Sequence, residues 1–256
     1  MIDFSQMAER AVVRYGYFLD ILRSQADVAF RRPGIDMSRG REQAVSTASE
    51  AARSFLATEQ GQLNDDTAEV FRHAHSAALS DLGLSDETVE DRFAEYIFSA
   101  AAYVTRIIAG QVERDVMAMA QHIQNLQLRQ DLYVRSGRHS LVSAQAAIMN
   151  ETSSSPTFRF LDRMGRNFKA TKHIRDIYRQ HLMNVWREVY MDVVASHGWE
   201  IVRVTHPDAN FKWQGVPLII SGADPEEEFD LYYDVRDEIF HPSSQAGITI
   251  KYEAED

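Results

Sequence analysis

The longest regular pattern of apolar positions lies between residues 89 and 126, where apolar residues recur at steps of three or four. This spacing is typical of one buried face of an α-helix. Ser85 or Asp86 can cap its start, and we expect the helix to run to about Arg135. At about 1.5 Å per residue it would be about 75 Å long, which is typical of a bundle or an assembly component. The apolar positions are Val89, Phe93, Ile97, Ala100, Val104, Ile108, Val112, Met119, Ile123 and Leu126.

The prolines divide the rest of the chain. They stand at positions 33, 156, 207, 217, 225 and 242, so residues 34–155 contain none. Because proline breaks helix interiors, we expect this stretch to be helical and the proline-containing remainder to differ from it. The further helices expected here are Phe4 to about Ala29, Met37 to Thr58 closed by Gly61, a third after Asp65 that ends near Leu82-Gly83, and Leu141 to Met149.

The period of the apolar positions changes along the C-terminal part. An apolar stripe predicts an amphipathic helix from about Asn167 to Ser196, closed by His197-Gly198. Alternation and β-branched residues then predict strands. The strand candidates are Trp199–Thr205, Val216–Ile220 and Gly247–Tyr252. The sequence therefore predicts an α+β, predominantly helical protein, with an elongated helical region over residues 1–150 and a small α+β domain over residues 151–256.

Composition excludes several kinds of site and location. The 256 residues include no cysteine, which excludes disulfides, thiolate metal ligands and a cysteine nucleophile. The N-terminal residues lack a basic segment followed by an apolar run, so we expect no signal peptide. The longest uncharged apolar stretch, Phe98–Val104, is far shorter than the roughly 20 residues that span a bilayer. We therefore expect a protein that is neither exported by the usual route nor embedded in a membrane.

The net charge of −11 argues against nucleic-acid binding by the whole surface. The charge is unevenly distributed, because residues 159–187 carry eight Lys and Arg and residues 224–256 carry eleven Asp and Glu. Internal pairing of the two segments is favoured slightly over contacts with charged neighbours. The candidate basic contact face on the predicted helix consists of Lys169, Lys172, Arg175 and Arg179.

Candidate catalytic chemistry is sparse. The chain lacks the phosphate-loop, dinucleotide-binding, hydrolase-elbow and zincin motifs. His73 and His75 lie two positions apart and so on different sides of a helix, which makes them poor joint metal ligands. The acidic segment 224–237, with Asp234 and Asp237, lacks the ligand spacing of a calcium loop, so a solvated loop is favoured over a cation site. We therefore predict no catalytic residue, no metal and no cofactor.

The segment that stands out is the predicted loop between the first two strands. Pro207 shapes it, and Asp208 and Asn210 can hydrogen-bond to their own backbone in Asx turns. Trp213 supplies a large anchoring side chain. We expect the loop to join two strands over the preceding helix, as a docking or structural element. Its candidate residues are His206, Asp208, Trp213, Gln214, Gly215 and, further along, His241.

Several short motifs of this region occur together in a known family. They are a helix with Arg166, Thr171 and Lys172, a Gly–strand–His step, the pair His206-x-Asp208-Ala and Trp213-Gln214-Gly215, and a later His241-Pro242. In these features, over about residues 160–250, the chain resembles the head-morphogenesis (Mu F-like) minor capsid proteins of tailed phages. The family's His-Pro-x-Cys-Arg ending is here His241-Pro242-Ser243-Ser244-Gln245, so any role of that cysteine is absent. Asn210 and Lys212 replace an Arg and a second His that the family pattern expects.

The resemblance implies a virion structural protein without catalysis, made in the host cytoplasm. It would assemble with the portal, the major capsid protein or both, as part of a symmetric oligomeric assembly, with the basic face in peripheral contact with packaged DNA. The alternative is a metal-dependent hydrolase or toxin-like effector in which His206, Asp208 and His241 converge. A helical regulator is disfavoured, because the chain shows no helix-turn-helix with a basic recognition face.

Overall fold

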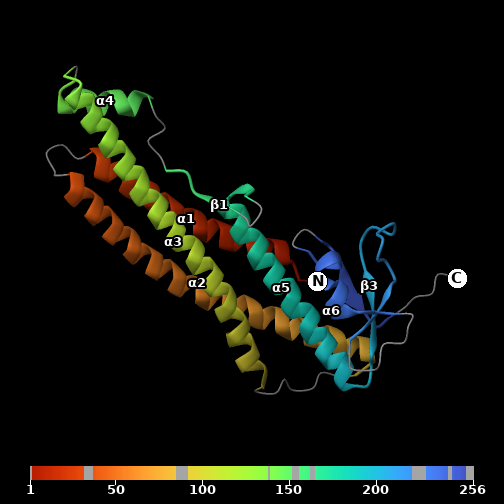
Figure 1. The fold of residues 1–256 in the computed structure, drawn as a ribbon. Coiled ribbons are helices and arrows are strands. Elements are labelled where there is room, and N and C mark those ends of the chain that lie inside the picture. The colour runs from red at the N-terminus through yellow and green to blue at the C-terminus, as the bar shows by residue number, and fades with distance from the viewer. Residues whose placement is uncertain are drawn as a thin grey trace. The chain divides into compact units, whose positions relative to one another are not determined.

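The computed structural model describes residues 2–31, 37–84, 92–137, 139–151, 156–161, 165–220, 229–241 and 244–251. Its helices are α1 (Phe4–Arg31), α2 (Met37–Leu82), α3 (Arg92–Arg135), α4 (Leu141–Glu151), α5 (Ala170–Ser196) and α6 (Tyr232–Ile239). Its strands are β1 (Arg159–Leu161), β2 (Asn167–Lys169), β3 (Ile201–Thr205), β4 (Pro217–Ile219), β5 (Asp230–Leu231) and β6 (Gly247–Thr249). The predicted α+β, predominantly helical class is confirmed (Figure 1).

The chain forms two compact units, each built from separate segments of the sequence. Unit 1 contains residues 1–8, 62–104 and 176–256, and unit 2 contains residues 9–61 and 105–175. These units interleave along the chain, so they do not test the predicted division into residues 1–150 and 151–256. That division stays a prediction. Within the described ranges, no helix combines the length and the apolar character that crossing a bilayer requires.

The predicted break at Gly61 is wrong, because α2 continues through it from Met37 to Leu82. Gly61 is not among the glycines with positive φ, and a glycine inside a helix costs only about 1 kcal/mol. Buried contacts flank it on both sides: Glu59 pairs with Arg14 in unit 2, and Leu63 is fully buried in unit 1. The stabilisation from these buried residues exceeds the cost of a glycine inside the helix. The predicted end of the helix at Gly83 is confirmed, with φ of 74°.

Unit 2 is a helical unit in which α1, α2 and α3 run side by side (Figure 1). Phe18 of α1 stacks on Phe55 of α2 with ring centroids 5.3 Å apart. Arg14 donates two hydrogen bonds, of 2.7 and 2.9 Å, to the buried carboxylate of Glu59. The predicted long helix is confirmed from Arg92 onward, and its predicted start at residues 85 and 86 lies outside the described residues. Its apolar positions from Val104 to Leu126 are buried as expected.

A small hairpin in unit 2 corrects the predicted start of the next helix. The sequence predicted a helix from about Asn167, but Asn167–Lys169 forms β2, which pairs antiparallel with β1, and α5 begins at Ala170. Phe160 of β1 lies opposite Phe168 and stacks on His173 of α5, with ring centroids 3.5 Å apart. Gly165, with φ of 76°, precedes β2. The apolar face of the hairpin therefore holds residues 167–169 in an extended conformation.

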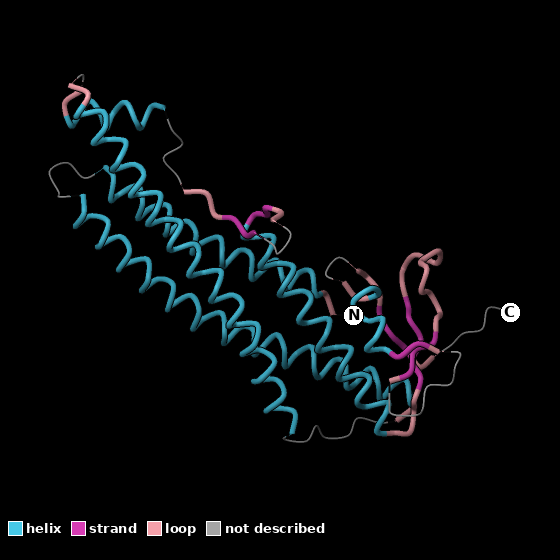
Figure 2. Tube along the Cα trace, in the orientation of Figure 1, coloured by secondary structure: helices cyan, strands magenta, loops and turns pink. Residues whose placement is uncertain are grey.

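Unit 1 contains the four-stranded sheet, whose strands are among those drawn in magenta in Figure 2. Their order is β5-β4-β3-β6. β3 pairs antiparallel with β4 and β6, and β4 pairs parallel with β5. Val202 and Val204 are the buried positions of β3, as the predicted alternation requires. They pack in one cluster with Tyr190 and Val194 of α5 and with Phe240 after α6. The three predicted strands are confirmed with shorter bounds, and the predicted end of the last one, Tyr252, lies outside the described residues. The predicted end of α5 at Gly198, with φ of 84°, is confirmed.

The acidic segment is only partly a loop. The prediction of a solvated loop over residues 224–237 is wrong for Asp234 and Asp237, which lie on α6. The buried side chains of Tyr232 and Ile239 anchor this helix on the sheet, which explains why an acid-rich segment is helical here. Residues 221–228, which contain the glutamates, lie outside the described residues.

Candidate functional site

The predicted loop between β3 and β4 is closed by its own hydrogen bonds in unit 1. The backbone N–H of His206 donates to Oε1 of Gln214 at 2.6 Å. The N–H of Gly215 donates to the carbonyl of Val204 at 2.8 Å, and Gly215 has a φ of 74° that favours glycine. Gln214 and Gly215 therefore close the loop, as the structural interpretation of the sequence expected.

His206 and Asp208 form a local turn at the start of this loop. The N–H of Asp208 donates to Nδ1 of His206 at 3.0 Å, and Oδ1 of Asp208 accepts from the N–H of Asn210 at 2.9 Å, which confirms the Asx turn at Asp208. The imidazole stacks on Phe211 with ring centroids 4.2 Å apart. Because Nδ1 accepts a hydrogen bond, the neutral ring carries its hydrogen on Nε2. His206 thus presents Nε2–H as a donor.

The remaining predicted loop residues have structural contacts. Trp213 packs half-buried against the core of unit 1, and the Lys212 ammonium lies 4.6 Å from the centre of its ring. Lys212 also pairs with Glu238 of α6 at 2.8 Å. His241 is exposed beyond α6. Across the described ranges, no three His, Asp or Glu side chains lie together as a metal site, so His206, Asp208 and His241 do not converge there.

A groove of about 780 Å³ lies next to His206, entirely within unit 1. One part of its lining is apolar and consists of Ile2, Phe4, Met183, Trp186, Pro207 and Ala246. The other part is polar and includes Arg179, Arg187, His73, His206, Thr205 and Gln245. Its acidic member is Asp3, whose Oδ1 accepts a hydrogen bond from the N–H of Gln6 at 3.0 Å. The groove thus combines an apolar wall with a cluster of cationic and donor groups.

Arg187 is the most unusual residue of this lining, because its side chain is only 2% exposed. Its Nη2 donates to Oδ1 of Asn184 at 2.5 Å, and its guanidinium lies 4.4 Å from the centre of the Phe240 ring. Burial lowers the pKa of the guanidinium, and the neighbouring Tyr232 and Glu188 oppose that shift. Among the described residues, its buried Nε has no hydrogen-bond partner.

The four residues of the predicted basic face have different roles. Within unit 2, Arg175 pairs with Glu9 at 2.6 Å, while Lys169 and Lys172 are exposed, with the Lys172 ammonium 5.0 Å from the centre of the Phe168 ring. Within unit 1, Arg179 donates to the carbonyl of Ser244 at 3.0 Å and lines the groove. The two lysines are therefore the exposed part of this face.

Comparison of the chain with protein-family models, with curated proteins and with solved structures found no match. The sequence interpretation missed Arg187, although a signal was present: Arg179, Met183 and Arg187 follow one another at steps of four on α5. Extending the basic stripe by two turns would have reached it. It also missed the N-terminal residues Ile2 and Phe4, for which no local pattern indicates a role.

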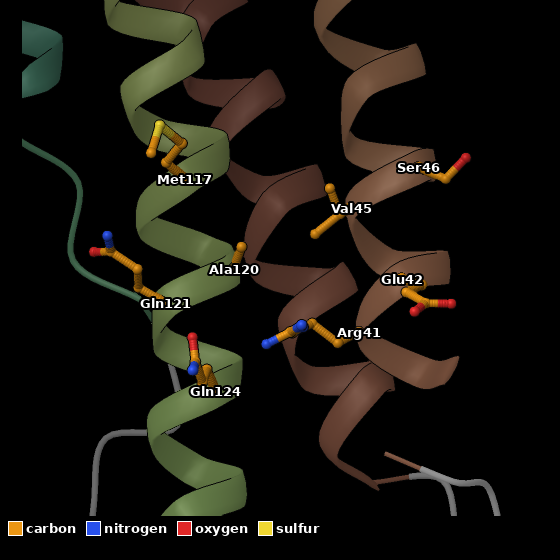
Figure 3. A pocket seen from close by; sticks show the side chains of 8 residues that line it. All are labelled: Arg41, Glu42, Val45, Ser46, Met117, Ala120, Gln121 and Gln124. Carbon is orange, nitrogen blue, oxygen red and sulfur yellow. The ribbon is translucent and has the colours of Figure 1, made fainter. Parts of the chain in front are cut away.

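A second hollow, of about 550 Å³, lies between α2 and α3 in unit 2 (Figure 3). Arg41 and Val45 of α2 and Met117 and Ala120 of α3 belong to its lining. Figure 3 shows Arg41 reaching toward α3, with Gln124 opposite. It lacks the buried charged side chain that distinguishes the groove beside His206.

Proposed function

We propose that the protein is a non-catalytic structural subunit of a larger assembly, and that this assembly is the head of a tailed phage. Its partners would be the portal protein, the major capsid protein or both, and its place would be the virion, after synthesis in the host cytoplasm. The phage assignment comes from the motifs at His206, Trp213 and His241. The assembly role is supported by features of the helices in unit 2.

The observation that carries the assembly role is an exposed apolar stripe on α1. Val13, Tyr17 and Ile21 follow one another at steps of four, with 55%, 68% and 42% of their side chains exposed. The opposite face of α1 is buried in the unit through residues such as Tyr15 and Leu22. A helix of a monomeric protein normally exposes polar residues on the face away from its core. Contiguous exposed apolar residues mark protein interaction sites.

A second set of exposed apolar residues lies where α3 ends and α4 begins, also in unit 2. Its members are Leu128, Leu132, Val134, Leu141 and Val142. Two such surfaces on one unit suit a subunit that contacts more than one neighbour, as in a closed ring. The metal-dependent alternative, with His206, Asp208 and His241, gains no support from the positions of these residues, and it stays a prediction for activity assays.

Two measurements test the proposal. Mass spectrometry of purified particles of the phage that encodes the chain should find it as a minor component, and its absence from the particles would contradict the phage assignment. Mass photometry should detect oligomers of the chain or its complex with the portal protein at micromolar concentration.

Variants separate the stripe from general effects on the surface. Tyr17→Glu should abolish the oligomer or the complex, because a carboxylate in an apolar interface is left desolvated without a partner. Ser46→Glu, on an exposed position of α2 in the same unit, makes the matched addition of charge and should change neither. If Tyr17→Glu assembles like the wild-type protein while its helix content is unchanged, the stripe is not the interface.

A further inference from the structure

We propose that the groove beside His206 binds a small organic acid, with its carboxylate at the arginines and its apolar body along Phe4, Met183 and Trp186. This site differs from the surfaces of unit 2 that carry the assembly role. It therefore stands or falls independently of the proposed function.

The charged end of the groove is built around Arg187. A guanidinium removed from water needs all its donors satisfied, and buried charges are normally paired. Arg187 donates to Asn184 and lies against the Phe240 ring, and the nearby Tyr232 and Glu188 favour its charged form. Its buried Nε lacks a partner among the described residues. Arg179 and the Nε2–H donor of His206 border the same space. An anionic ligand in the groove would add negative charge next to these cationic and donor groups.

The geometry of arginine favours a carboxylate. The donors of a guanidinium are arranged as a planar fork that matches the two oxygens of a carboxylate. Nη2 of Arg187 is directed to Asn184, which fixes the orientation of its guanidinium. Nη2 of Arg179 is likewise held by the carbonyl of Ser244, which fixes that side chain in place. The cationic groups are thus positioned before a ligand arrives.

The other end of the groove determines which apolar group the acid must carry beside its carboxylate. Its walls are the side chains of Ile2, Phe4, Met183, Trp186 and Pro207, which offer apolar surface and no strong donor other than the indole N–H. The volume of about 780 Å³ falls within the range of roughly 300–1,000 Å³ that small-molecule sites occupy. A simple inorganic anion would leave this apolar part unfilled. An aromatic or aliphatic acid would fill both parts.

A purely structural role for Arg187 is the competing explanation. In that case the arginine only supports the sheet through Phe240 and Asn184, and the groove has no preference for acids. The two explanations differ in what they predict for ligands. Both predict that loss of Arg187 lowers stability.

Titration calorimetry of the full chain with 1-naphthoate, 1-naphthylmethanol and inorganic phosphate distinguishes them. The acid should bind, and the neutral alcohol and the phosphate should each bind at least about tenfold more weakly, the factor expected for loss of a hydrogen bond to a charged group. Because Trp186 borders the groove, the acid should also change the tryptophan fluorescence.

Variants locate the binding. Arg187→Gln keeps a donor for Asn184 and should weaken naphthoate binding at least about tenfold. Arg179→Gln should weaken it as well, and Lys212→Gln, which removes the same charge outside the groove, should leave it within about twofold. If Arg187→Gln does not fold, Arg179→Gln and the comparison of acid with alcohol on the wild-type protein decide the matter.

Three results would overturn the proposal. The first is no binding of 1-naphthoate at millimolar concentration. The second is equal affinity for the acid and the alcohol, or for the acid and phosphate. The third is unchanged affinity in folded Arg187→Gln and Arg179→Gln.

Discussion

Asp115 gives the sharpest test of the core of unit 2, because it is a carboxyl group that is only 1% exposed. Its Oδ2 accepts a hydrogen bond from the hydroxyl of Tyr15, and its Oδ1 accepts one from Nε2 of Gln111 at 3.0 Å. Burial raises its pKa from the ordinary 3.8 to about 6, against the smaller opposing effects of Tyr15, Gln111 and Arg114. Burial therefore decides the direction of the shift.

The sign of the effect on stability follows from linkage. Between pH 4 and pH 6 the folded protein holds a proton on Asp115 that the unfolded chain has lost, so stability falls as the pH rises through this range. Each pH unit corresponds to about 1.4 kcal/mol. The pKa values of 3.8 and about 6 therefore correspond to a loss of about 3 kcal/mol that is complete above pH 6.

Asp115→Asn removes the titration and keeps the hydrogen bonds. The amide oxygen can accept from Gln111, and the amide N–H can donate to the hydroxyl oxygen of Tyr15. The stability of the variant relative to the wild-type protein should therefore increase by about 2.5 kcal/mol between pH 4 and pH 7. Urea unfolding followed by far-UV circular dichroism at several pH values measures this difference. Taking the difference cancels contributions from groups that both proteins share, such as His173.

One outcome would refute the reasoning. If the difference between Asp115→Asn and the wild-type protein stays constant to within about 0.5 kcal/mol from pH 4 to pH 7, the pKa of Asp115 is not raised. The hydrogen bonds from Tyr15 and Gln111 would then outweigh burial. A difference that changes in the opposite direction would mean that they lower the pKa below its ordinary value.

Two further predictions concern α2 and unit 1. Gly61→Ala should raise the free energy of unfolding by about 0.5–1 kcal/mol, because Gly61 lies inside a helix with no atom within 4 Å of an added Cβ. Gly83→Ala should lower the free energy of unfolding by about 1 kcal/mol, because Gly83 has a φ of 74°. Chemical denaturation measures both changes, and a loss of stability in Gly61→Ala would contradict the continuous helix. Burial lowers the pKa of His181, which hydrogen-bonds to Thr67 at 3.1 Å, to about 4. The free energy of unfolding of unit 1 should therefore fall by about 3 kcal/mol as the pH falls from 7 to 4. In His181→Gln this loss should be absent. Tryptophan fluorescence follows unit 1, because all three tryptophans lie in it, and equal acid sensitivity of the two proteins would exclude this role for His181.

The parts of the fold that the sequence predicted are those decided by a repeated local pattern. The apolar stripe of α3 and the alternation of β3 both arise from burial of one face, and both are confirmed. Gly61 was misjudged because its local preference for a break is worth about 1 kcal/mol, while Glu59 pairs with Arg14 of another helix and Leu63 is fully buried. The hairpin of β1 and β2 was missed because three residues are too few to show a period.

The same distinction applies to the site. The turn at His206 and Asp208 was predictable, because its hydrogen bonds join residues two positions apart. The groove was not predictable, because its lining comes from the N-terminal residues, from α2, from α5, from the end of β3 and from the start of β6. Nothing in the local sequence relates Phe4 to Arg187. That proximity is a consequence of tertiary packing.

The contacts of the arginines on α5 also limit how strongly the chain can bind DNA. A contact with packaged DNA was expected to use four basic residues, but Arg175 pairs with Glu9 and Arg179 donates to the carbonyl of Ser244. The exposed lysines, Lys169 and Lys172, would then carry most of the contact. Two phosphate contacts give a slope of log K against log salt of only about −1.8, too shallow for stable binding by a chain with a net charge of −11. If the chain is a virion subunit, as proposed, association through the apolar surfaces of unit 2 would be the stronger basis for its incorporation, and a DNA contact would form only once protein partners hold the chain there.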